Sequence, residues 1–218
     1  MQSLKGYISE GRNDPSIFHA IFMAGSPGAG KSHVATLLAL NTLGYKEINS
    51  DTQFEKYMKD AFLDLEFNKK QQFQRNVTRA VAKRHVASKQ RHAEIGRLGL
   101  LIDGTAKSVG KIQAQKKELE SKGYECAMIY VSTDVFAAIA ADKQRERSLG
   151  PDLVTSMHKS VEKNIDQFRK QFGKLFFEVD NSNWEKTPSI TRPLYNKIVK
   201  WSKTMPKNKA AKEWLRNN

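Results

Sequence analysis

The stretch Gly25-Ser-Pro-Gly-Ala-Gly-Lys-Ser32 places its residues at the spacing G-x-x-x-x-G-K-[ST]. An apolar run at 17–24 precedes this stretch, and a segment with helical spacing at 32–44 follows it. A buried strand, a glycine-rich turn and a helix in this order are typical of a loop that binds phosphate through backbone N–H groups. The stretch therefore predicts a nucleotide-binding fold, and the rest of the chain is interpreted outward from it.

The predicted phosphate-binding loop assigns roles to single residues. Glycines allow the backbone to come close to phosphate oxygens. Lys31 is expected to reach the β- and γ-phosphates, and the hydroxyl of Ser32 is expected to hold Mg²⁺. The loop therefore predicts that the protein binds ATP and Mg²⁺. The predicted nucleotide-binding residues are Gly25, Ser26, Pro27, Gly28, Ala29, Gly30, Lys31, Ser32 and the flanking His33, for which a packing role is the alternative.

The alternation of short apolar runs with helical segments predicts the fold class. Strands are expected at 17–24, 45–51, 98–103, 124–133 and 174–181, with helical segments between them. Strands that alternate with helices form a parallel sheet that is covered on both faces. We therefore predict an α/β P-loop NTPase fold of the kinase type, with about five parallel strands flanked by helices.

Two aspartates follow predicted strands, at the sheet edge where ligands bind in such folds. Asp51 ends the segment 45–51, where its carboxylate could accept a proton from an attacking hydroxyl. The alternative role for Asp51 is the N-cap of the next helix. Asp103 ends LLID at 100–103 and resembles a Walker B aspartate that holds Mg²⁺, with Thr105 as a weaker companion. The alternative for Asp103-Gly104 is a simple turn.

A polar break between two helical segments carries two arginines. Arg145 and Arg147 lie in DKQRERSLG at 142–150. Such a segment can act as a lid that brings guanidinium groups onto a transferring phosphoryl group. The alternative is a solvated run of charges. We predict a lid at about 142–152, with Arg145 and Arg147 joining Lys31 and Asp51 as catalytic residues.

Several motifs together resemble one family. The motifs that carry this resemblance are GSPGAGKS, NSD followed by FE, LLIDGT, GYECAMIYV and RERSLG. Through them the chain resembles the zeta-toxin-like P-loop kinases, especially members found in large phage genomes. The resemblance covers about residues 18–181. It implies a phosphotransferase that depends on ATP and Mg²⁺, with Lys31 and Ser32 at the phosphates, Asp51 as general base and Arg145/Arg147 in the lid. Polynucleotide 5′-hydroxyl kinases and phage kinases that act on hydroxymethyluracil in DNA are similar in plan.

The net charge of +14 is concentrated in two regions. Residues 69–97 hold nine Lys or Arg and one acid, and residues 192–218 hold eight Lys or Arg and one acid. An excess of positive charge favours nucleic acid or another polyanion as a partner. A solvated basic surface is the alternative for the first region. Its predicted nucleic-acid-binding residues are Arg75, Arg79, Lys83, Lys89 and Arg91, on an outward ridge opposite an inward face of Phe73, Val77 and Val81.

Aromatic residues accompany the lysines of the second region. Tyr195, Trp201 and Trp214 could stack on unpaired nucleotides, or they could anchor amphipathic helices to the core. We predict a P-loop kinase domain at 1–181, with a basic helical insertion at about 66–97, and a basic helical C-terminal extension at 182–218.

Composition excludes some classes of protein. No apolar run approaches the roughly 20 residues that span a membrane, and the N-terminal 15 residues lack the apolar core of a signal peptide. Cys126 is the single cysteine, so an internal disulfide is excluded. His85 and His92 lie on a polar helical segment without nearby ligands, and we assign no metal to them. We expect a cytoplasmic protein, in the host cytoplasm if it is phage-encoded, and the sequence leaves its oligomeric state open.

The leading functional prediction is transfer of the γ-phosphate of ATP to a hydroxyl group of DNA or another polynucleotide. The hydroxyl would be a 5′-hydroxyl or that of a hydroxymethyl base such as 5-hydroxymethyluracil. The first alternative is a kinase for a small molecule, such as a UDP-sugar or a nucleoside monophosphate. The second alternative is an ATPase that binds nucleic acid and has only water as acceptor.

Overall fold

A computed structural model describes residues 14–66 and 69–217. The N-terminal stretch interpreted above as lacking a signal peptide lies mostly outside the described residues. Five strands form one sheet in the order β2-β3-β1-β4-β5, and each neighbouring pair is parallel. The strands are β1 (His19–Ala24), β2 (Lys46–Ile48), β3 (Leu100–Asp103), β4 (Glu125–Ser132) and β5 (Phe176–Asp180). The predicted five-stranded parallel sheet is confirmed.

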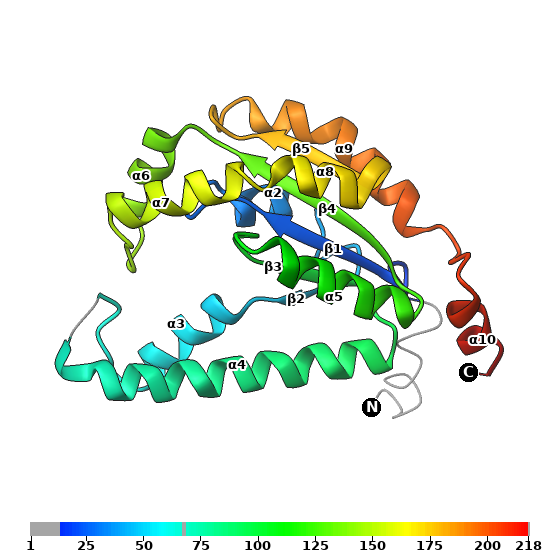
Figure 1. The fold of residues 1–218 in the computed structure, drawn as a ribbon, viewed down its shortest axis with the longest axis horizontal. Helices are drawn as coiled ribbons and strands as arrows, with labels where there is room; N and C mark the ends of the chain where they lie inside the picture. Colours follow the sequence, from blue (N-terminus) through cyan, green and yellow to red (C-terminus); the bar gives the residue numbers. More distant parts are fainter. Residues whose placement is uncertain (1–13, 67–68, 218) are drawn as a thin grey trace, which may run out of the picture.

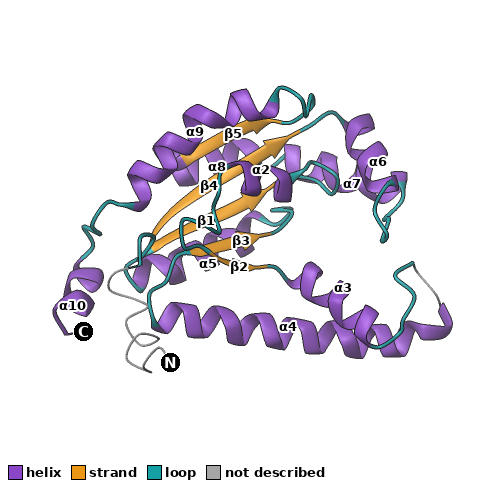
Figure 2. Ribbon diagram, turned by 180° about the vertical axis from the view of Figure 1, so that it is seen from behind, coloured by secondary structure: helices purple, strands orange, loops and turns teal. Residues whose placement is uncertain are grey.

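Helices cover both faces of this sheet (Figures 1 and 2). The helices before β3 are α2 (Lys31–Leu37), α3 (Ser50–Asp60) and α4 (Gln72–Ile95), the last preceded by a short 3₁₀ turn at Lys69–Gln71. Those after β3 are α5 (Val109–Ser121), α6 (Val135–Lys143), α7 (Pro151–Glu162), α8 (Ile165–Phe172), α9 (Thr187–Ser202) and α10 (Lys209–Asn217). One expected long helix, 153–172, is thus two helices, α7 and α8.

Alternation along the central strand β1 divides the core into two layers. Ala20 and Phe22 face a layer formed with α4, α5, α7 and α8, whereas Ile21 and Met23 face a layer formed with α2 and α9. Side chains of successive strand residues point to opposite faces, so a continuous apolar strand is buried on both sides. The sheet is therefore covered as the parallel arrangement requires.

The C-terminal segment completes one face of the sheet. Leu194 and Ile198 of α9 are buried in the layer beside α2, and Tyr195 and Trp201 pack against the same layer. In α10 the ring of Trp214 meets Phe18 edge-to-face, with 5.5 Å between ring centroids. These aromatics thus lie against the core, as expected for residues that anchor amphipathic helices.

Helix α4 runs along the β2 edge of the sheet, and α3, which continues beyond the end of β2, lies beside the first half of α4 (Figure 1). Phe54 and Met58 of α3 form a small apolar cluster with Ala82 of α4. Farther along α4, Val86 and Ala93 join the main core. Because α4 is much longer than the sheet edge, only part of one face of this helix is buried.

Candidate active site

The phosphate-binding loop links β1 to α2, and neighbouring segments press closely against it. A Cβ atom on Gly28 would lie 2.1 Å from the carbonyl oxygen of Ala138, and its φ is +80°. A Cβ atom on Gly30 would lie 2.2 Å from Nδ2 of Asn181, and its φ is +82°. At Gly28 both the space, which is limited by backbone atoms of Ala138, and the positive φ require glycine, and at Gly30 the positive φ favours it. His33, a predicted nucleotide-binding residue, is exposed beside the loop.

Lys31 folds back onto its own loop. Its Nζ donates to the carbonyl oxygen of Gly25 at 3.2 Å and lies 3.5 Å from that of Ser26. Burial lowers the pKa of the Lys31 ammonium group, and the nearby carboxylate of Asp103 partly opposes this effect. An enclosed cation that donates to neutral carbonyl oxygens is well placed to bind anionic phosphate oxygens.

Asn49 connects the start of α3 to Asp103. Its Oδ1 accepts hydrogen bonds from the N–H groups of Asp51 at 2.9 Å and Thr52 at 3.3 Å, so Asn49 is the N-cap of α3. Its Nδ2 donates to Oδ2 of Asp103 at 2.8 Å. The N-cap role that was the alternative for Asp51 is therefore filled by Asn49, which sequence reasoning missed. An asparagine directly before a helix was the available signal.

Asp103 has the character of a cation ligand. Its Oδ1 atom is buried and has no hydrogen-bond partner within the described part of the chain. Burial raises the pKa of Asp103, with the ammonium of Lys31 opposing the increase. An orphaned carboxylate oxygen beside Ser32 and Thr105 in one pocket fits Mg²⁺, which prefers oxygen ligands and phosphates. Among the described residues no three His, Cys, Asp or Glu side chains cluster as a metal site, so Mg²⁺ would be held together with the nucleotide.

Asp51 lies in the first turn of α3, with its side chain 60% exposed. Its Oδ1 lies 3.7 Å from Nη1 of Arg147 and 3.8 Å from Nη1 of Arg79. These separations exceed hydrogen-bond lengths, so the carboxylate stays accessible to a third group. Its role as general base stays a prediction.

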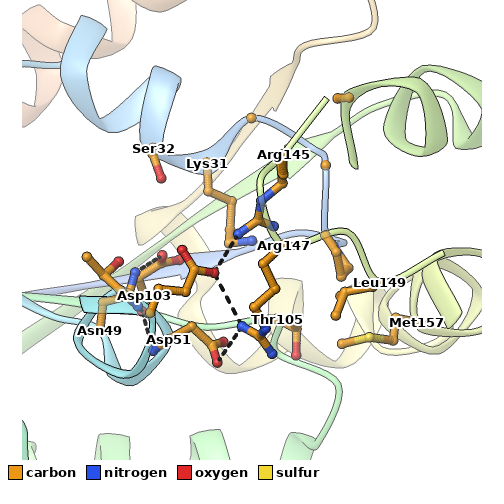
Figure 3. A pocket seen from close by; sticks show the side chains of 16 residues that line it. Lys31, Ser32, Asn49, Asp51, Asp103, Thr105, Arg145, Arg147, Leu149 and Met157 are labelled. Carbon is orange, nitrogen blue, oxygen red and sulfur yellow. Dashed lines mark hydrogen bonds and ion pairs between the residues drawn. The ribbon is translucent and has the colours of Figure 1, made fainter. Parts of the chain in front are cut away.

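The lid arginines reach α3 from the segment between α6 and α7 (Figure 3). Nη2 of Arg145 lies 3.4 Å and Nη1 of Arg147 lies 3.3 Å from Oε1 of Glu55. Glu55 was quoted in the motif FE but was given no role. Because glutamate at this position follows Asp51 by one helical turn, both carboxylates face the lid.

These groups line one cavity of about 360 Å³. Lys31, Ser32, Asp51, Asp103, Arg145 and Arg147 all contribute to its wall, together with Asn49, Glu55 and Thr105 (Figure 3). The structure thus brings together every residue that was predicted to be catalytic or to bind the metal.

Asn181 is a second residue that sequence reasoning missed. It follows β5, donates from Nδ2 to the carbonyl oxygen of Ala29 at 2.9 Å, and accepts from Oγ1 of Thr187 at 2.6 Å. It therefore ties the phosphate-binding loop to α9. Its position after the last strand, at the sheet edge where ligands bind, was the available signal.

The prediction that Phe73, Val77 and Val81 form the inward face of α4 is wrong. Their side chains are 77%, 48% and 39% exposed. The inner face instead carries Arg75 and Arg79, which follow the same helical spacing as the buried Ala82 and Val86 further along. Helical periodicity identifies a stripe of residues but not its partner, and α3 presents Phe54, on which a flat guanidinium group can stack.

The five basic residues of the predicted nucleic-acid ridge therefore have different positions. Arg75 donates to the carbonyl oxygen of Glu66 at 2.8 Å and to that of Asp64, so it holds the α3–α4 connection. The guanidinium of Arg79 lies 4.2 Å from the centre of the Phe54 ring, beside Asp51. The remaining three, Lys83, Lys89 and Arg91, are exposed, and their role in binding nucleic acid stays a prediction.

Comparison with known proteins agrees with this geometry. A structure described as that of a candidate kinase from Chloroflexus aurantiacus has a TM-score of 0.53 and 13% identity, covering 84% of this chain and 95% of that one. A structure from the PezAT toxin–antitoxin system of Streptococcus pneumoniae has a TM-score of 0.57 and 14% identity, covering 91% of each chain. Fold and site thus define a P-loop NTPase of the kinase type.

The family follows from the sequence comparison. The model of the Zeta toxin family matches residues 10–182, which is most of the chain. The protein therefore belongs to the zeta toxin family, as the motifs indicated. The search of curated proteins finds no match. No helix within residues 14–66 and 69–217 is long and apolar enough to cross a membrane.

Proposed function

We propose that the protein transfers the γ-phosphate of ATP to a hydroxyl group in a reaction that depends on Mg²⁺. One observation carries this proposal: an accessible carboxylate, that of Asp51, lines the same small cavity as Lys31 of the phosphate-binding loop and the unpartnered Oδ1 of Asp103. An enzyme that only hydrolyses ATP also needs groups such as Lys31 and Asp103, which would bind the phosphates and Mg²⁺. An accessible carboxylate in this cavity, which could receive the proton of a hydroxyl, favours transfer to an acceptor.

Each residue has a defined part in the proposed reaction. Asp51 accepts the proton of the acceptor hydroxyl. The oxygen of that hydroxyl forms a bond to the γ-phosphorus, while the bond between the γ-phosphorus and the bridging oxygen of ADP breaks. Lys31, Arg145 and Arg147 stabilise the charge on the transferring group. Ser32 and Asp103 would hold Mg²⁺, which when bound neutralises phosphate charge.

The leading acceptor in this proposal is a polynucleotide, through a 5′-hydroxyl or a hydroxymethyl base such as 5-hydroxymethyluracil. Positive charge supports it: Arg79 stands beside Asp51, and the exposed Lys83, Lys89 and Arg91 continue along α4 away from the cavity. Phosphates spaced along a nucleic-acid backbone would match cations spaced along a helix. The size of the cavity keeps a small acceptor, such as a UDP-sugar or a nucleoside monophosphate, as the alternative.

The proposal is tested by following the γ-³²P label of ATP. Oligonucleotides with a 5′-hydroxyl, DNA containing hydroxymethyluracil, nucleoside monophosphates and UDP-sugars are offered separately, and polymer is then separated from small molecules. We expect label in the polymer, which Asp51→Asn lowers by about 10²–10⁴-fold while ATP binding is retained. Label found only in small molecules would show that the acceptor is a small molecule and not a polynucleotide. Release of free phosphate alone would contradict transfer and favour the ATPase.

A further inference from the structure

The segment that carries the lid arginines is tied to the end of α6 by a buried carboxylate. Asp142 lies in the last turn of α6, and its side chain is almost fully buried, at 1% exposure of the residue. Its Oδ2 accepts three hydrogen bonds, from Oγ of Ser148 at 2.8 Å, from the N–H of Leu149 at 2.7 Å and from the N–H of Gly150 at 3.2 Å. One oxygen atom therefore closes the loop in which Arg145 and Arg147 lie.

The loop also makes contacts with α3. On the α3 side, Arg145 and Arg147 meet Glu55, and Glu146 pairs with Lys59 on the surface. The pair of Glu146 and Lys59 is exposed and contributes little, because water competes for both partners and salt screens them. The side chains of Arg147 and Glu55 are more enclosed, at 14% and 28% exposure. The buried side chain of Asp142 holds three donors of the loop at once, and its loss would leave each of them without this partner.

We infer that Asp142 is a positioning residue that orders the lid before the nucleotide arrives, so that Arg145 and Arg147 stand at the cavity without a large closing movement. This inference rests on the proposed phosphoryl transfer for its kinetic consequence. The ordering of the loop is independent of that transfer. A guanidinium group that is already in place stabilises developing charge without the cost of ordering its loop during the reaction.

The carboxylate can be tested by graded substitutions. Asp142→Ala removes all three bonds, and Ser148→Ala removes one of them. Asp142→Asn keeps an amide oxygen that can accept the same three bonds, because the second carboxylate oxygen, Oδ1, has no partner among the described residues and none is lost there. Asp134→Ala is the matched control, since Asp134 caps the other end of α6 by accepting from the N–H groups of Phe136 and Ala137.

Limited digestion with trypsin measures lid order directly, because Lys143 ends α6 next to the loop and Arg145 and Arg147 lie within it, and all three are cleavage sites. We expect Asp142→Ala to speed cleavage after these three residues by about tenfold or more, as local opening becomes easier. Ser148→Ala should have a smaller effect, and Asp142→Asn and Asp134→Ala should leave the cleavage rate close to that of the unchanged protein. Cleavage after exposed Lys163 and Lys170, mapped by mass spectrometry, serves as the internal reference.

Kinetics gives the second readout. Asp142→Ala should lower kcat about 10–100-fold with less than about threefold change in the KM for ATP, and Asp142→Asn should restore most of the rate. If Asp142→Ala does not fold, Ser148→Ala and Asp142→Asn are compared instead, and the order of their cleavage rates decides. Lid cleavage that is unchanged in Asp142→Ala, or that rises equally in Asp134→Ala, would overturn the inference. If the protein without substitutions transfers label to no acceptor, the proposal of phosphoryl transfer is refuted. The inference about lid order is not affected, because the trypsin digestion does not depend on transfer.

Discussion

At the scale of single residues, the site depends on charges that the fold partly removes from water. Lys31 is enclosed with carbonyl partners at 3.2 and 3.5 Å, and one oxygen of Asp103 has no partner in the described structure. Buried polar groups without full partners cost stability. Both groups are therefore explained by ligands that would complete them, phosphate for the lysine and Mg²⁺ for the aspartate.

Replacing Lys31 should separate stability from function. Lys31→Met keeps most of the side-chain volume and removes the buried charge, so we expect a higher melting temperature without nucleotide and loss of ATP-dependent stabilisation. Thermal unfolding with and without ATP and Mg²⁺ measures both effects. Lys163→Met, at an exposed position, is the control for a surface lysine. A lower melting temperature of Lys31→Met would show that its ammonium stabilises the ligand-free fold.

The lowered pKa of Lys31 also predicts how its stability contribution changes with pH. Below the lowered pKa both the folded and the unfolded chain carry the proton, and the burial cost is present in full. Between that pKa and the ordinary value of 10.5, the unfolded chain binds more protons than the folded one. The free energy of unfolding therefore increases with pH in this window. Unfolding titrations at alkaline pH should show that Lys31→Met lacks this increase.

The raised pKa of Asp103 predicts the acid limb of the pH–rate profile. A protonated carboxyl cannot serve as a ligand of Mg²⁺, and burial lifts the pKa of Asp103 above its ordinary value of 3.8. We expect kcat/KM for ATP to fall as pH decreases while the pH is still above 3.8. Raising the Mg²⁺ concentration should move this limb to lower pH, because the cation competes with the proton. A limb that does not respond to Mg²⁺ would assign it to another group.

At the scale of elements, the first turn of α3 determines where the proposed base lies. Asn49 caps the helix and also donates to Asp103, so one side chain aligns the proposed base with the proposed metal ligand. The N-cap geometry directs the next residues, Ser50 and Asp51, into the first turn. The sequence EINSD predicted a strand followed by a helix, but only the packed structure distinguishes the capping residue from the candidate base.

Two substitutions of Asn49 separate these tasks. Asn49→Ala should lower the free energy of unfolding by about 1 kcal/mol through the lost cap, and it should also lower the transfer rate. Asn49→Asp keeps a capping oxygen but replaces the donor to Asp103 with a like charge, so the contribution of the cap is retained while the Mg²⁺ concentration needed for half-maximal rate changes. Denaturant unfolding and Mg²⁺ titration measure the two effects. Equal behaviour of both variants in both assays would contradict this division.

At the scale of the whole molecule, only some of the basic side chains of α4 are available on the surface. Arg75 and Arg79 are used inside the α3–α4 pair, whereas Lys83, Lys89 and Arg91 remain on the surface. If a polynucleotide is the acceptor, its binding should depend on salt, because each phosphate that is neutralised releases counterions.

Removing the three exposed charges tests this dependence. The triple substitution of Lys83, Lys89 and Arg91 to Gln should weaken binding of oligonucleotides and reduce the slope of log affinity against log salt by about two to three, at roughly 0.7–0.9 per phosphate contact. Substitution of Lys163, Lys170 and Lys174, three exposed lysines elsewhere, to Gln is the control. If the two triple variants weaken oligonucleotide binding equally, α4 has no specific role in binding, and its charges form a general basic surface.

The sequence by itself determined the class of this protein. The spacing of glycine, lysine and serine in 25–32, the buried strands and the aspartates that follow two of them predicted the parallel sheet, the phosphate-binding loop and the residues around it. These features are local, since a motif or a strand is encoded within a few neighbouring residues. The structure confirmed the sheet, and it brought Lys31, Asp51, Asp103 and the lid arginines to one cavity.

Only the tertiary structure decided which face of each helix meets which neighbour. In α4 two stripes have similar helical spacing, and the one predicted to be buried is exposed because Phe54 of α3 stacks with Arg79. Asn49, Asn181 and Asp142 were missed for a related reason: each is a common polar residue whose partners lie in other elements. Periodicity and motifs describe one segment at a time, whereas hydrogen bonds between segments exist only once the chain has folded.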